Sequence, residues 1–166
     1  MFKVFWGYTR AVFLAIVTGL VLVFALEIEK IPDSSMQPTI LSEDYVFINK
    51  TAYLYSEPAR GDVVALRNYL HTASGGGALF ASRIEGVAGD QVITEDGSRE
   101  TVREGYVYVV SDGSRDAAVF SAGDRNGQEE SLLDSRNSAV GQVAVEEILG
   151  RIEWIVWPYN RWGRLS

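Results

Sequence analysis

The sequence predicts a mainly β protein, with an N-terminal transmembrane helix followed by a single antiparallel β domain. Two patterns predict this class: one long apolar run at the N-terminus, and a later series of short segments rich in β-branched and aromatic residues, each bounded by turn residues. Helical and strand patterns do not alternate, which argues against a parallel α/β sheet. We place the membrane anchor at residues 1–30 and the β domain at residues 31–166.

The anchor is predicted from apolar length. Residues 11–26 carry no charge, and the stretch of residues 4–26 spans about 34 Å as a helix, enough to cross a bilayer. Arg10 inside this stretch can extend its charge toward the headgroups. Basic residues precede the run and two glutamates follow it, so the positive-inside rule places the N-terminus in the cytoplasm and the domain on the exported side. We therefore expect a single-pass protein of the inner membrane that contacts lipid through residues 4–26.

A cleaved signal peptide is the alternative interpretation of this segment, because its length and charge pattern overlap with those of an anchor. A cleavage site of the Ala-x-Ala type does not follow the run, where the sequence reads Phe24-Ala25-Leu26-Glu27. The sequence therefore favours an anchor that stays attached.

Five segments after the anchor fit β-strands, since they combine β-branched and aromatic residues with flanking turn residues. They are residues 45–49, 62–66, 91–94, 106–110 and 152–157. Residues 143–149 could form a helical turn or two. Residues 68–79, with a Gly-rich centre, and residues 111–136, rich in Gly, Ser, Asp and Glu, predict two long loops.

Composition excludes several function classes. The chain has no cysteine, a single histidine (His71) and a formal net charge of -7. Disulfide scaffolds, thiol nucleophiles and cysteine zinc sites are thereby excluded, and one histidine argues against a histidine-built metal site. The acidic balance argues against nucleic acid, whose phosphates require clustered Lys and Arg. We expect neither a metal nor another cofactor.

The stretch Asp33-Ser34-Ser35-Met36-Gln37-Pro38-Thr39 follows the apolar run after a few residues. Taken alone, paired serines before a proline indicate a turn or a cap more often than a nucleophile. Four further segments follow it in order. They are Ala59-Arg60-Gly61-Asp62-Val63-Val64, Arg83-Ile84-Glu85-Gly86-Val87-Ala88-Gly89-Asp90, Asp134-Ser135-Arg136, and Gly150-Arg151 with Trp157-Pro158-Tyr159-Asn160-Arg161.

In this order and with an N-terminal anchor, these segments resemble the type I signal peptidases, the S26 family of serine peptidases. The family's segments read Ser-x-Ser-Met-x-Pro-Thr, Arg-Gly-Asp-Val-Val, Lys-Arg-Val-x-Gly-x-Pro-Gly-Asp and Gly-Asp-Asn-x-x-Asp-Ser-Arg. Gly-Arg and Trp-Pro-x-Asn-Arg-x-Gly follow in many members. The resemblance covers nearly the whole chain and implies a β domain of signal-peptidase type.

The resemblance implies that the protein cuts the leader from an exported preprotein, with Ser35 as the nucleophile. In the family a neutral Lys is the general base, its pKa lowered by an apolar pocket. The substrate lies extended and adds to strand edges, which here fall near residues 31–34 and 80–84. Four residues beside the nucleophile are then expected to bind substrate: Asp33, Ser34, Met36 and Arg83.

The family's catalytic Lys is missing from this sequence. Alignment on the third segment puts Ser82 at its position, so we take Ser82 as the second catalytic position. The three lysines lie elsewhere, at Lys3, Lys30 and Lys50. Arg83 cannot replace the base, because a guanidinium stays protonated at any working pH.

Two more departures concern residues around the nucleophile. Asp33 replaces a Ser that often donates to the oxyanion, and Leu132 replaces the Ser that orients the Lys. His71 is a candidate base, but a role as an exposed loop residue is the simpler interpretation. We expect Asp134 and Arg136 to form a structural ion pair. Asp62 and Asp90 are interpreted as turn residues, and Ala88 replaces the third segment's Pro.

Two functions therefore stay open. The first is a signal-peptidase-like serine endopeptidase, with a dedicated pilin-type preprotein as a candidate substrate. The second is an inactive homologue that binds an exported peptide or a pilin subunit and assists its assembly.

Overall fold

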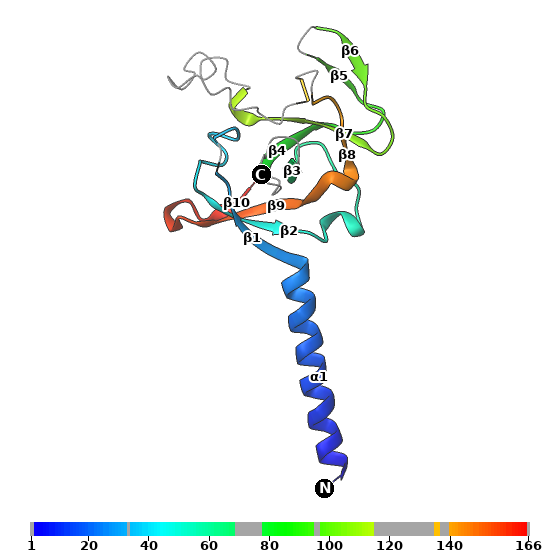
Figure 1. Cartoon of the computed structure of the whole chain (residues 1–166), viewed down its shortest axis with the longest axis vertical. Helices are drawn as coiled ribbons and strands as arrows, with labels where there is room; N and C mark the ends of the chain where they lie inside the picture. The colour runs from blue at the N-terminus through cyan, green and yellow to red at the C-terminus, as the bar shows by residue number, and fades with distance from the viewer. Residues whose placement is uncertain are drawn as a thin grey trace.

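The computed structural model describes residues 2–32, 34–68, 78–94, 97–114, 135–136 and 140–165, apart from some side chains in the N-terminal helix and at residues 68 and 78. Helix α1 (Phe2–Ala25) extends away from a domain built of β-strands (Figure 1). Within the described part of the chain, no helix is both long enough and apolar enough to cross a membrane. The predicted transmembrane helix is thus not confirmed by the structure.

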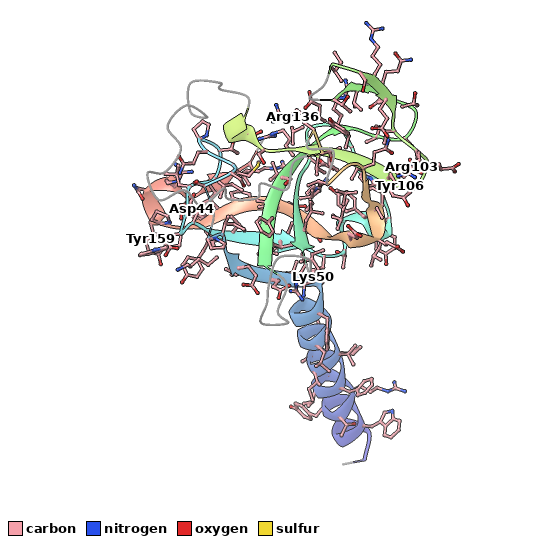
Figure 2. All side chains as sticks on the ribbon, turned by 45° about the horizontal axis from the view of Figure 1, so that its top comes forward. Asp44, Lys50, Arg103, Tyr106, Arg136 and Tyr159 are labelled. Carbon is pink, nitrogen blue, oxygen red and sulfur yellow. The ribbon has the colours of Figure 1, made fainter. Side chains whose placement is uncertain are left out.

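The junction between α1 and the domain lies earlier than the sequence predicts. Leu26–Lys30, placed above in the anchor, forms strand β1 and pairs antiparallel with β2 (Tyr45–Asn49). Its alternation of apolar and glutamate residues has the two-residue period of a strand. The backbone N–H of Lys50 donates to the carbonyl of Ala25 at 3.0 Å, and Figure 2 shows Lys50 at this junction. Helix and sheet therefore meet without a linker.

The remaining elements complete an eight-stranded sheet with the order β1-β2-β9-β3-β4-β7-β8, in which β10 also pairs with β9. These strands are β3 (Val63–Asn68), β4 (Ala78–Gly86), β7 (Tyr106–Val110), β8 (Val143–Ala144), β9 (Ile148–Trp157) and β10 (Gly163–Arg164). β5 (Gln91–Ile93) and β6 (Arg99–Thr101) form a separate hairpin. Every pairing is antiparallel, so the predicted mainly β, antiparallel class is confirmed.

In the described residues, four short 3₁₀ helices connect the strands: η1 (Ala52–Leu54), η2 (Asp112–Ser114), η3 (Val145–Glu147) and η4 (Tyr159–Arg161). All five predicted strands occur. Of the helical turn predicted at residues 143–149, only Val145–Glu147 (η3) is helical, and the residues on either side belong to β8 and β9. The first predicted loop ends two residues early, because β4 starts at Ala78, while residues 69–77 and 115–134 lie outside the described part.

The apolar side chains of the sheet are divided between its two faces. Val63, Ala65 and Ala81 belong to one buried cluster, whereas Val64 and Leu66 belong to a second cluster. This division follows from the alternation of side chains along a strand. The first cluster also takes in side chains from the segment between β1 and β2, and it is this segment that carries Ser35.

Candidate active site

The Ser35 loop (residues 34–40) is a tight turn fixed to the first core cluster. Its turns are closed by Gln37 N–H donating to the Ser34 carbonyl at 3.1 Å and by Ile40 N–H donating to the Met36 carbonyl at 2.9 Å. Met36 and Ile40, four residues apart, are both fully buried in the core. Ser35 directly precedes Met36 and is 5% exposed. The burial of Met36 and Ile40 therefore fixes the loop to the core immediately after its serine.

Helix η2 fastens the same loop from the other side. The Gly113 N–H donates to the Ser35 carbonyl at 2.8 Å. A Cβ at position 113 would lie 2.9 Å from that carbonyl oxygen, which is closer than real Cβ atoms come to a backbone oxygen. Only glycine allows this approach, so the contact depends on the residue type.

A buried ion pair lies beside this contact. Arg83 donates from Nε and Nη2 to the carboxylate of Asp112 at 2.9 and 2.8 Å, and Thr39 Oγ1 donates to the same carboxylate at 2.6 Å. Arg83 Nη1 donates to the Gly61 carbonyl at 2.9 Å. The Arg83 and Asp112 side chains are 12% and 8% exposed. The hydrogen bond with Asp112 raises the pKa of Arg83, against the lowering effect of burial.

The contacts of Arg83 indicate that this residue supports the Ser35 loop. Each of its three guanidinium nitrogens donates to a group of the protein itself. Met36, also predicted to bind substrate, is fully buried in the core. Ser34 is exposed, and Asp33 lies outside the described residues. Substrate binding by these four residues stays a prediction.

Ser82 lies one residue before Arg83 on β4 and is fully buried. Its cross-strand neighbour on β3 is Val64, a member of the second core cluster. Cross-strand neighbours project from the same face of a sheet, and successive residues from opposite faces. Ser82 therefore projects from the face of the second cluster, and Arg83 from the face that carries the Ser35 loop.

The two lysines of the β domain are engaged elsewhere. Lys30 forms an ion pair with Glu43, and Lys50 forms one with Glu27. The hydrogen bond from Lys30 to Glu43 raises the pKa of Lys30. A lysine acts as a general base only when its pKa is lowered, so Lys30 is held in the wrong protonation state for this role.

The β4 strand offers an extended backbone beside the Ser35 loop. β3 pairs with β4 from Ala78 to Arg83, whereas the ladder between β7 and β4 covers only Arg83 to Gly86. Residues 78–81 thus extend past the end of the β7 ladder. At that end the chain turns into η2, whose Gly113 contacts Ser35.

Comparison with known proteins identifies the family. The sequence profile described as "Signal peptidase, peptidase S26" matches residues 5–102, more than half of the chain. The chain is also 32% identical over 164 residues to a probable signal peptidase I-2 of Synechocystis sp., covering 86% of this chain and 68% of that protein. The chain belongs to the peptidase S26 family.

Other relatives agree with this assignment. The chain is 27% identical over 158 residues to a signal peptidase I of Leptolyngbya laminosa, covering 86% of this chain and 74% of that protein. It is 27% identical over 174 residues to the mitochondrial inner membrane protease subunit 2 of Danio rerio, covering 96% and 85%. Membership of the S26 family supports a leader-peptidase function and implies an exported preprotein as substrate.

Asp112 is the residue of this S26 site that the sequence interpretation misses. Asp134, predicted to pair with Arg136, lies outside the described residues, as do His71 and Leu132. Ser135 is described: its N–H donates to the Val109 carbonyl at 2.8 Å, and its Oγ accepts the Val109 N–H at 3.0 Å. This segment therefore returns to the β7 backbone beside the site.

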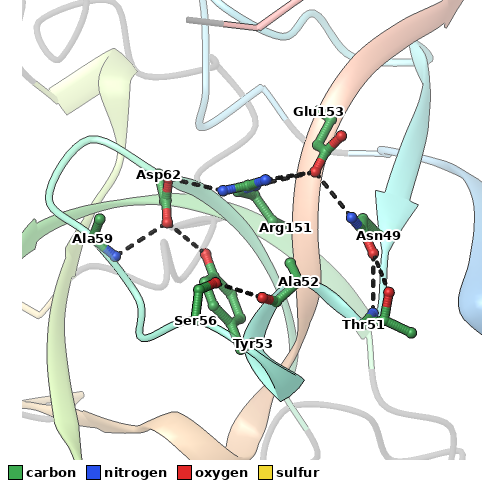
Figure 3. Close-up of polar contacts among 9 residues, drawn as sticks. All are labelled: Asn49, Thr51, Ala52, Tyr53, Ser56, Ala59, Asp62, Arg151 and Glu153. Carbon is green, nitrogen blue, oxygen red and sulfur yellow. Dashed lines mark hydrogen bonds and ion pairs between the residues drawn. The ribbon is translucent and has the colours of Figure 1, made fainter.

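Asp62 has the turn role predicted for it and also joins a larger network (Figure 3). Its carboxylate accepts the Ala59 N–H at 3.1 Å and the Tyr53 hydroxyl at 2.9 Å. Arg151 lies 3.9 Å from Asp62 and donates to Glu153 at 2.7 Å. Burial, and then the charge of Asp62, raise the pKa of Tyr53. The network steadies the turn whose Gly61 carbonyl receives Arg83.

Proposed function

We propose that this S26 protein is a membrane-anchored leader peptidase with Ser35 as its nucleophile. The observation that carries the proposal is the fastening of the Ser35 loop by Gly113 at the place where residues 78–81 of β4 extend past the β7 ladder. A leader segment can add there as a further strand, since main-chain hydrogen bonds need no particular side chains. The scissile carbonyl would then lie beside Ser35.

The reaction requires Ser35 Oγ to attack the scissile carbonyl while its proton passes to a base. Lys30 is paired with Glu43, which raises its pKa, and Lys50 is paired with Glu27. Neither lysine of the β domain is therefore placed to act as the base. Ser82, Asp33 and His71 stay predicted groups whose replacement tests the base, although Ser82 projects from the face of the second cluster.

The proposal includes an anchor in the inner membrane, with the N-terminus in the cytoplasm and the β domain on the exported side. Helix α1 has 24 residues, about 36 Å at 1.5 Å per residue. Its described apolar side chains are exposed to the surroundings rather than packed on the domain, among them Val12, Phe13, Leu14, Ile16 and Leu20. We keep the two-part organisation and move its boundary to Ala25, where α1 ends.

An exposed aromatic strip on the outer face of β1, β2 and β9 supports the same placement. Tyr45 lies opposite Trp157, and Phe47 lies opposite both Ile28 and Trp154. Most of these side chains are exposed, as are Tyr159 and Trp162 beside them. Aromatic residues of this kind favour the boundary between lipid and water. The strip begins on the strand that follows α1 directly.

The test is mass spectrometry of the N-termini of exported proteins in cells that carry the wild type, Ser35→Ala or Ser56→Ala. Ser56 is the control, because it is an exposed serine outside the predicted catalytic and substrate-binding residues. We expect one preprotein, such as a pilin-like subunit, to keep its leader only in the Ser35→Ala cells. Unchanged N-termini in those cells would refute the peptidase function.

The second candidate is an inactive S26 homologue that binds an exported peptide and assists its assembly. The observation that favours it is the fully buried Ser82 at the position of the family's base. A photo-crosslinking residue at Leu79 distinguishes the two functions. The helper function predicts crosslinks to an exported peptide that are equal in wild-type and Ser35→Ala backgrounds, with no change in any N-terminus.

A further inference from the structure

We infer that Arg161, in the C-terminal segment, is a positioning residue for the Ser35 loop, acting through Asp44 and the Thr39 carbonyl. This inference rests on the proposed function for its catalytic consequence, whereas its structural part concerns the loop alone. Arg161 donates from Nε to the Asp44 carboxylate at 3.1 Å and from Nη2 to the Thr39 carbonyl at 3.1 Å. These contacts join residues more than a hundred positions apart in the sequence.

Asp44 closes the chain segment that contains the Ser35 loop. Its backbone carbonyl accepts the Ile31 N–H at 2.9 Å, its N–H donates to the Leu41 carbonyl at 3.1 Å, and its carboxylate accepts the Leu41 N–H at 2.9 Å. The Glu43 N–H donates to the Ile31 carbonyl at 2.8 Å. Asp44 thus ties Ile31, three residues before the loop, to Leu41, directly after it.

The Asp44 carboxylate depends on Arg161 for its charge partner in the described structure. The Asp44 side chain is 3% exposed, and the Arg161 side chain is 25% exposed. A buried carboxylate without an opposite charge is costly, and an unsatisfied buried carbonyl adds to that cost. The fork of donors on a guanidinium can serve a carboxylate and a carbonyl together. Arg161 is therefore placed to bind the Asp44 carboxylate and the Thr39 carbonyl at the same time.

Thr39 receives support from two directions. Its hydroxyl donates to Asp112 at 2.6 Å, beside Arg83, and its carbonyl accepts from Arg161. Together with the Gly113 contact to Ser35, these bonds fix the loop at its first and last turns. Arg161 comes from η4, directly after β9, so its position is set by the last long strand of the sheet. Figure 2 shows Asp44 on the same side of the domain as Tyr159, the first residue of η4.

The experiment compares Arg161→Ala with Arg164→Ala in the full chain, purified in detergent. Arg164 is the matched control, since it is an exposed arginine three residues later on β10. Amide hydrogen exchange of residues 35–44 reports the loop, and steady-state cleavage of a leader peptide reports kcat and KM. For Arg161→Ala we expect loop exchange at least about tenfold faster and kcat about 10²-fold lower, with KM within about twofold of the wild type. Arg164→Ala should change none of these.

Wild-type exchange or wild-type kcat in Arg161→Ala overturns the inference. If Arg161→Ala speeds exchange throughout β3 and β4 as well, Arg161→Lys replaces it, because it keeps the charge and loses the fork. Faster exchange confined to the loop in Arg161→Lys supports the inference, and any other pattern overturns it. If the wild type cleaves no leader peptide, the proposed function fails, and the exchange data alone decide whether Arg161 positions the loop.

Discussion

The ion pair between Arg83 and Asp112 allows a direct test of what holds the Ser35 loop. Replacing Arg83 by alanine removes the charge partner of Asp112, whose side chain is 8% exposed in the intact pair, with the Thr39 hydroxyl as a remaining donor. Breaking a buried pair by removing one partner costs about 3–5 kcal/mol. The free energy of unfolding of a domain is about 5–15 kcal/mol, so this loss is a large fraction of the total.

Arg60→Ala is the matched control for this experiment. Arg60 pairs with Asp90 at 3.5 Å, and its side chain is 61% exposed. Exposed pairs contribute about 0–1 kcal/mol. The same residue type is therefore removed in both variants, and the difference between them reports burial and hydrogen bonding.

The assay is urea unfolding of the full chain in mild detergent, followed by tryptophan fluorescence. With a slope of about 2 kcal/mol per molar urea, Arg83→Ala should lower the midpoint by about 1.5–2.5 M, and Arg60→Ala by less than about 0.5 M. Equal midpoints for the two variants would refute the reasoning, because the buried pair would then contribute no more than an exposed one.

Two further predictions concern single contacts. Gly113→Ala places a Cβ 2.9 Å from the Ser35 carbonyl, so we expect a lower urea midpoint and faster amide exchange in residues 35–40. The control is Gly61→Ala, which has open space around its Cβ and should cost only about 1 kcal/mol for its positive φ. Similar exchange of residues 35–40 in both variants would contradict the prediction for Gly113. The raised pKa of Tyr53 means that the folded state holds this proton more tightly than the unfolded state, whose tyrosine pKa is about 10. This contribution to stability is full below about pH 10 and is lost as the pH rises above it. The urea midpoint should therefore fall less between pH 8 and pH 11 in Tyr53→Phe than in the wild type. An equal fall in both proteins would contradict the raised pKa of Tyr53.

The sequence predicted those parts of the fold that local patterns determine. Tyr45–Asn49 and Tyr106–Val110 are predicted with their observed bounds, because their β-branched and aromatic residues stand between clear turn residues. Leu26–Lys30 is misplaced, since its first residue continues the apolar run of the helix. The alternation within these five residues is a short local signal, and the pairing with β2 decides the structure.

The candidate site follows the same division. The Ser35 loop could be located from a local motif, whereas the partners of Arg83 and Arg161 could not. Asp112 had no local signal, because it lies within residues 111–136, which the sequence predicts to be a long loop. The face from which Ser82 projects depends on the register between β3 and β4, which composition does not determine.

The direct connection between α1 and β1 limits how far the Ser35 loop can lie from the end of α1. With α1 embedded in lipid as proposed, the Ser35 loop starts only a few residues after the five residues of β1, which span about 17 Å when extended. A leader whose apolar core ends at the lipid surface then needs only a short extended segment to reach the Ser35 loop. Substrates would then be selected by the number of residues between their apolar core and the scissile bond. Inserting two residues between Ala25 and Leu26 should lengthen the preferred spacing.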